Sequence, residues 1–220
     1  MLRFRLFDVP YTVGIYFWIF AALLGQNVAT GPNAILLLVV WVACAFVSVV
    51  VHELGHALSA RYCGVQPAVE LYTLGGVTRM SGRALTRTEG FWVTFCGPAA
   101  GFTLYLAIVA VSRWLYPRPD LGTTAGLAAG AAIQFLLWAN LWWTVLNLLP
   151  ILPLDGGLML RSVLGPRHLK ATEAVGVGLA GALAVVMAFQ RQWYTALFLA
   201  YLAYVNFQGN PRSLPGATGG

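Results

Sequence analysis

The chain has 220 residues, of which 59% are hydrophobic and only 9% are charged. Soluble domains carry roughly 25% charged residues, so this composition excludes a chain whose whole surface faces water. We therefore predict an integral membrane protein that forms a single membrane-embedded domain over residues 1–220. The formal net charge of +6 is typical of loops that face anionic lipid. No polar cluster of basic and aromatic residues favours nucleic acid as a partner.

Uncharged stretches of about 20 residues mark helices that can cross the hydrocarbon core of a bilayer. The sequence contains six such stretches, and we predict an all-α polytopic membrane protein with about six transmembrane helices. The predicted spans are residues 11–30, 34–60, 91–112, 124–149, 174–190 and 192–208. The first apolar run is expected to be a retained helix rather than a secretion signal, because no clear small-x-small cleavage site follows it.

The connection after the second span, residues 62–90, is too polar to cross a membrane. Side chains alternate over residues 69–74, then Gly75 and Gly76 interrupt the run, and a second alternating run continues to Ser81. Alternation broken by a glycine turn is typical of paired strands. We predict a small β-hairpin at the membrane interface, between the second and third spans.

Basic residues divide unequally between the two sides of the predicted membrane domain. With six spans, ten fall on the side that holds both termini and residues 62–90, and three fall on the other. The ten are Arg3, Arg5, Arg61, Arg79, Arg83, Arg87, Arg161, Arg167, Lys170 and Arg212, and the three are Arg113, Arg118 and Arg191. An excess of Lys and Arg marks the cytoplasmic side. We expect a multi-pass protein of the plasma membrane of a prokaryote, with the cytoplasmic end of the second span near residue 61.

Residues 52–56 read His-Glu-Leu-Gly-His, an HExxH motif at the end of the second span. Positions i and i+4 of a helix share a face, so His52 and His56 can bind one metal ion, and Glu53 can reach a water beside it. Ionisable side chains in an apolar helix are costly unless they have a function. The alternative is a pair of helix-end histidines stabilised by the helix dipole. The motif predicts zinc, with Glu53 as a general base, inside the bilayer near its cytoplasmic side.

A catalytic zinc ion usually has three protein ligands and one open position. Asp155 ends a long uncharged run in the segment NLLPILPLDGG, residues 147–157, whose prolines interrupt a spanning helix. The glycines after it allow the backbone to turn so that the carboxylate points inward. Asp155 is therefore the candidate third ligand. The alternative is that it caps a helix beginning near Gly156.

Asn140, Thr144 and Asn147 fall at i, i+4 and i+7, which places them on one face of the fourth span. Such side chains can hydrogen-bond to a neighbouring helix, or they can line the water-filled pocket that a hydrolase with a membrane-embedded active site needs. We predict the pocket for Asn147, because it lies nearest Asp155 in the sequence. Both alternatives stay open for Asn140 and Thr144.

Three motifs together resemble the site-2 protease family of intramembrane zinc metalloproteases. They are HELGH at 52–56, GPAAG at 97–101 and NLLPILPLDGG at 147–157. Many relatives have Asn where Gly101 stands, so no polar role is carried over to that position. We expect no PDZ or CBS module, such as larger relatives carry, within these 220 residues.

The resemblance implies one zinc ion per chain, held by His52, His56 and Asp155, with Glu53 as the base. It also implies that Asn147 helps to hold the substrate or the developing oxyanion. The implied activity is hydrolysis of peptide bonds in or near the transmembrane segments of single-pass membrane proteins, as in regulated intramembrane proteolysis.

Other functions compete with this interpretation. A membrane zinc transporter or sensor can use the same His and Asp ligands, but it does not need Glu53 beside the metal. A scaffold without catalysis would not need to keep all four key side chains. A membrane protease that acts on soluble proteins or on prenylated protein termini would carry a second glutamate motif instead of the element Leu154-Asp155-Gly156. A presenilin-like aspartyl protease needs two intramembrane Asp residues, and this chain offers one. The oligomeric state is not indicated.

Overall fold

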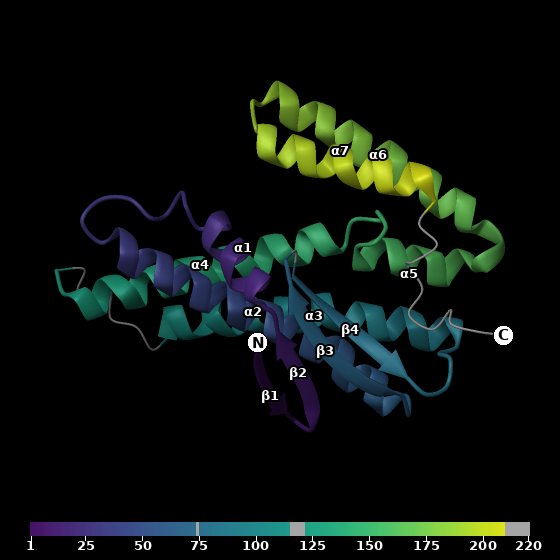
Figure 1. The fold of residues 1–220 in the computed structure, drawn as a ribbon, viewed down its shortest axis with the longest axis horizontal. Helices are drawn as coiled ribbons and strands as arrows, with labels where there is room; N and C mark the ends of the chain where they lie inside the picture. The colour runs from purple at the N-terminus through teal and green to yellow at the C-terminus, as the bar shows by residue number, and fades with distance from the viewer. Residues whose placement is uncertain (74, 115–121, 210–220) are drawn as a thin grey trace.

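The computed structural model describes residues 1–73, 75–114 and 122–209, and it shows long helices with a small sheet packed against them (Figure 1). Leu74, Arg118 and Arg212, which entered the sequence predictions, lie outside these residues. The strands are β1 Leu2–Leu6, β2 Val9–Val13, β3 Gln66–Tyr72 and β4 Gly75–Ser81. The helices are α1 Ile15–Leu24, α2 Ala34–Tyr62, α3 Arg87–Trp114, α4 Thr124–Asn147, α5 Asp155–Leu164, α6 Leu169–Phe189 and α7 Trp193–Gln208, with a 3-10 turn at Pro166–His168.

Four helices among the described residues are long and apolar enough to cross a membrane, namely α2, α3, α4 and α6. They overlap the spans predicted at 34–60, 91–112, 124–149 and 174–190. The span predicted at 192–208 corresponds to α7, whose 16 residues reach only about 24 Å at 1.5 Å per residue. The predicted count of six spans is therefore not confirmed.

The predicted first span is wrong at its start. Residues 11–13 belong to β2, and α1 has 10 residues, which reach about 15 Å. In β2, the alternating side chains of Val9, Tyr11 and Val13 are almost completely buried against α1, α2 and β3. The apolar residues at the start of this run therefore form the core beneath the sheet, which composition alone does not distinguish from a membrane span.

A two-residue turn joins β1 to β2 in an antiparallel hairpin, with Leu6 opposite Val9. The turn residues Phe7 and Asp8 have φ of 47° and 60°. Positive φ at both central residues is the requirement of the type I′ turn, whose twist matches that of the flanking strands. The N-terminus is therefore part of the sheet.

The four described strands lie in the order β1-β2-β3-β4, with β2 parallel to β3 and the other pairs antiparallel. The β3–β4 pair is a hairpin over residues 66–81, between α2 and α3. Its position relative to a membrane interface stays a prediction. The parallel pairing places the N-terminal hairpin beside residues 66–81 and leaves β4 as an edge strand of the described sheet (Figure 1).

The end of α2 is set by Gly64, which has φ of 77°. Its N–H donates to Arg61 O at 2.9 Å, and the N–H of Val65 donates to Ala60 O at 3.1 Å. These two bonds form a Schellman motif, which satisfies the last helical carbonyls and reverses the chain. The turn sends the chain from the helix that carries the HExxH motif directly into β3.

The α6–α7 hairpin contacts the rest of the described chain through α5 and residues 148–154 (Figure 1). Ile151 packs with Ala180 and Leu202 in a buried cluster. Asn206, on α7 and 2% exposed, accepts a hydrogen bond from Leu152 N at 3.2 Å and donates to Leu152 O at 2.5 Å. The α6–α7 hairpin thus holds the loop that leads to Asp155.

Candidate metal centre

The HExxH residues lie in the C-terminal half of α2, where His52, Glu53 and His56 are all more than 90% buried. The helical spacing turns both imidazoles to one face, and their Nε2 atoms are 3.2 Å apart. Two ring nitrogens at this separation point at a common space. The structure therefore places the two histidines as the spacing predicts.

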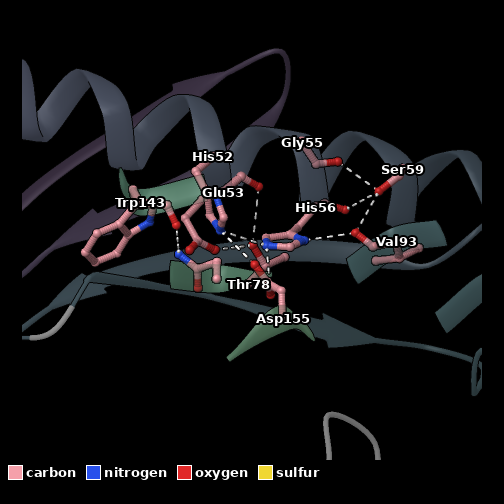
Figure 2. Close-up of polar contacts among 10 residues, drawn as sticks. His52, Glu53, Gly55, His56, Ser59, Thr78, Val93, Trp143 and Asp155 are labelled. Carbon is pink, nitrogen blue, oxygen red and sulfur yellow. Dashed lines mark hydrogen bonds and ion pairs between the residues drawn. The ribbon is translucent and has the colours of Figure 1, made fainter. Parts of the chain in front are cut away.

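Asp155 meets the histidines from α5, about 100 residues later in the chain (Figure 2). Its Oδ2 lies 3.1 Å from His52 Nε2, and its Oδ1 lies 3.4 Å from His56 Nε2. One ligand atom from each of the three residues lies within 4.8 Å of the other two. Asp155 is the first residue of α5 and Leu154 is the N-cap, so the carboxylate faces the histidines instead of capping the helix.

Gly156 and Gly157 allow α5 to begin tightly packed against the preceding loop. A Cβ at Gly156 would lie 2.2 Å from Leu148 O, and a Cβ at Gly157 would lie 2.5 Å from the carbonyl carbon of Ile151. Both glycines are helical and neither has a positive φ. The carboxylate points inward as expected, but the glycines supply no positive φ for a turn, and it is their missing side chains that the packing requires.

The orientation of His56 is set by α3. Its Nδ1 lies 2.9 Å from Val93 O. A carbonyl only accepts, so Nδ1 carries the proton and Nε2 keeps its lone pair for the side of Asp155. A Cβ at Gly97 would lie 2.1 Å from His56 Nε2, so this position must be glycine for α3 to pass so close. The GPAAG motif therefore begins with a residue that makes room for the imidazole.

These donors fit a divalent metal ion. Two imidazole nitrogens and one carboxylate are a ligand set that catalytic zinc sites use. His52 Nδ1 and Asp155 Oδ2 are buried without a hydrogen bond among the described residues. The neighbour of Oδ2 is His52 Nε2 at 3.1 Å, and a metal ion between these two atoms would supply the partner that a hydrogen bond does not. His168, by contrast, is exposed, and its Nδ1 bonds to Leu164 O within its own turn.

Glu53 lies beside this cluster and contacts the sheet. Figure 2 shows the side chains of His52, Glu53 and His56 extending from α2 toward the side on which Asp155 and Thr78 lie. Thr78 Oγ1, on β4, is 2.7 Å from Glu53 Oε2. The side chain of Glu53 thus extends from α2 and is held by β4.

The polar stripe of α4 is buried, as Asn140, Thr144 and Asn147 are at most 9% exposed. Asn140 donates to Ser48 Oγ on α2 at 2.9 Å, and Thr144 donates to Pro98 O on α3 at 3.4 Å. Both residues therefore make hydrogen bonds between helices, as the first of the two alternatives predicts. Asn147 donates to Trp143 O in its own helix, so this bond does not join it to the metal cluster.

Two contributions to the site could not be found by motif. The carbonyl of Val93 has no sequence signal, because every residue has one. Thr78 carried a weak signal, since it lies in the predicted hairpin on the face opposite the exposed Val77 and Arg79. The sequence did not indicate that this face would meet Glu53.

Helices long and apolar enough to cross a membrane, together with a buried cluster of two histidines and an aspartate that could hold a metal ion, indicate an integral membrane protein with a candidate metal centre. The family model of Peptidase family M50 matches residues 40–119 and 118–189, more than half of the chain. The chain belongs to this family, and the predicted resemblance to site-2 proteases is confirmed.

Curated relatives carry the name zinc metalloprotease. Rip3 of Mycobacterium tuberculosis, named as one, is 32% identical over 190 residues, which cover 81% of this chain and 46% of Rip3. Zinc metalloprotease MJ0392 of Methanocaldococcus jannaschii is 28% identical over 188 residues, which cover 84% of this chain and 51% of the relative. The chain thus spans about half the length of these relatives.

The fold is shared with a solved structure, the site-2 protease from Methanocaldococcus jannaschii. The two align with a TM-score of 0.61 over 94% of each chain, at 22% sequence identity. At this identity the likeness establishes a common fold.

Proposed function

We propose that this chain is an intramembrane zinc metalloendopeptidase that cuts peptide bonds in or near the transmembrane segments of single-pass membrane proteins. The observation that carries the proposal is the convergence of His52, His56 and Asp155 within 4.8 Å, with Glu53 buried beside them. Membership of Peptidase family M50 and the names of the relatives support it. We expect one zinc ion per chain, because the chain offers one such ligand set among its described residues.

His52, His56 and Asp155 would hold the zinc ion, which, when bound, polarises a carbonyl and acidifies water. Glu53 takes the proton from the attacking water and passes it to the leaving amine. Asn147 donates from its amide to the developing oxyanion, for which it must turn away from Trp143 O.

The substrate must be extended at the point of cleavage, because the carbonyls of a helix are hydrogen-bonded within it. An unwound segment in lipid needs new partners for its backbone. β4 is the edge strand of the described sheet and contacts Glu53 through Thr78, so a peptide could add there as a further strand and pair with its outer backbone groups. A single-span membrane protein, unwound over a few residues, fits this arrangement.

The active site faces the cytoplasm in this proposal. The excess of basic residues on the side of residues 62–90 supports this orientation. The sheet adds to it, because Arg3 and Arg5 on the N-terminal hairpin lie on the same sheet as Arg79. The plasma membrane of a prokaryotic cell is the proposed location.

The test is cleavage by purified protein in lipid vesicles, with a panel of tagged single-span substrates. We expect wild type to cleave at least one of them, to stop when a chelator removes zinc, and to resume when zinc is returned. Zinc flux is followed in the same vesicles. Flux without cleavage of any substrate would favour the membrane zinc transporter instead.

A further inference from the structure

We infer that Thr78 is a positioning residue for Glu53, and that its hydroxyl holds the carboxylate of the general base in the orientation that proton transfer needs. The inference rests on the proposed function, because it assigns a role in that reaction. It concerns a strand residue outside the three motifs.

The contact between the two side chains is short and buried. Thr78 is 8% exposed and Glu53 is 4% exposed. Thr78 Oγ1 is 2.7 Å from Glu53 Oε2 and 3.4 Å from the backbone oxygen of Glu53. A hydroxyl has one proton to donate. The carboxylate oxygen Oε2 is both the nearer and the stronger of the two acceptors. Thr78 therefore donates to Oε2.

The backbone of β4 approaches the same carboxylate from Gly76. Gly76 and Thr78 are two residues apart and share a face of the strand. A Cβ at Gly76 would lie 2.4 Å from Glu53 Cγ and 2.6 Å from Cδ and from Oε1. The missing side chain at Gly76 thus leaves room for the carboxylate, and the hydrogen bond from Thr78 orients it.

This arrangement divides the two oxygens of Glu53 between two tasks. Oε2 accepts from Thr78, and Oε1 keeps its lone pairs for the proton of water. A carboxylate free to rotate would spend part of its time turned away from that water, which lowers turnover more than substrate binding. The same strand presents the edge proposed to bind the substrate, so base and substrate are aligned by one element.

The experiment compares Thr78→Val, which removes the hydroxyl at nearly constant shape, with Thr78→Ser, which keeps it. A hydrogen bond to a charged group contributes enough that its loss should lower kcat about tenfold to a hundredfold. We expect that fall in Thr78→Val with KM within about twofold, and kcat within about threefold of wild type in Thr78→Ser. Thr12→Val is the matched control, because Thr12 lies on β2, two strands from β4, and it should leave kcat unchanged.

Zinc content and the visible spectrum of the cobalt-loaded protein provide a readout independent of turnover. Both should match wild type in Thr78→Val, because no metal ligand is changed. If Thr78→Val does not fold, Thr78→Ser against Thr78→Ala makes the same comparison. In a Glu53→Asp background, whose shorter carboxylate no longer reaches the hydroxyl, Thr78→Val should cause no further loss.

Three results would overturn the inference: wild-type kcat in Thr78→Val, equal losses in Thr78→Ser and Thr78→Val, or a fall in activity that only follows a fall in zinc. These results leave the proposed function standing, provided that wild type cleaves. Absence of cleavage by zinc-loaded wild type would remove both.

Discussion

At the scale of single residues, the candidate centre joins two histidines four positions apart with an aspartate about 100 residues later, and their ligand atoms lie within 4.8 Å of one another. His52 and His56 follow from helical spacing, so the sequence alone could place them together. Asp155 could be proposed as their partner, but its distance from them depends on how α5 packs. Thr78 could not be connected to Glu53 from the sequence, because the contact joins a helix to a strand 25 residues later.

Removing a ligand should release zinc. We expect His56→Ala and Asp155→Ala to bind zinc more than about a hundredfold more weakly, since even the loss of a residue that only orients a ligand costs 10- to 100-fold. His168→Ala is the control, because this histidine is exposed and lies outside the cluster. Elemental analysis after dialysis against a weak chelator measures the loss. Full retention in Asp155→Ala would remove Asp155 from the ligand set.

At the scale of the elements, the site depends on how closely α3 passes α2. Gly55 and Gly97 lie at this crossing, where a Cβ on Gly55 would lie 2.2 Å from Cys96 O. The GPAAG motif was visible in the sequence, but its role was not, because small residues in a membrane helix indicate close packing without naming the partner. The partner of Gly97 is His56, a predicted ligand.

Gly97→Ala should therefore damage the metal centre without changing any ligand. Its methyl group would lie 2.1 Å from His56 Nε2, so the imidazole or the helix must move. We expect a clear loss of zinc affinity and a lower Tm. Gly178→Ala on α6 is the control, because a Cβ there meets no atom within 4 Å. Equal zinc affinity in the two variants would show that the α2–α3 crossing tolerates displacement.

At the scale of the whole molecule, composition predicted the long helices and failed at the N-terminus. Each of α2, α3 and α4 contains an apolar stretch long enough to cross a membrane, which is uncommon in soluble proteins. The N-terminal hairpin also carries apolar residues, but they pack beneath a sheet whose β2–β3 pairing joins residues 11–13 to 69–71. Pairing between segments so far apart leaves no local sequence pattern.

The orientation in the membrane is open to direct measurement. In a variant whose three cysteines are replaced, a cysteine at Ser81 should react only with reagents on the cytoplasmic side, because the basic residues gather there. A cysteine at Thr124, at the other end of α3 and α4, should react only from outside. Labelling of Ser81 from outside sealed cells would reverse the proposed topology.

The central claim is that Glu53 acts as a base in peptide hydrolysis, and Glu53→Gln tests it most directly. The amide keeps nearly the same size but cannot accept a proton at neutral pH, so zinc content should equal that of wild type. General acid–base catalysis contributes about 10²- to 10⁴-fold, so cleavage of a single-span substrate in vesicles should fall at least about a hundredfold. Cleavage at the wild-type rate by zinc-loaded Glu53→Gln would contradict the account. So would zinc flux that is equal in both proteins while neither cleaves.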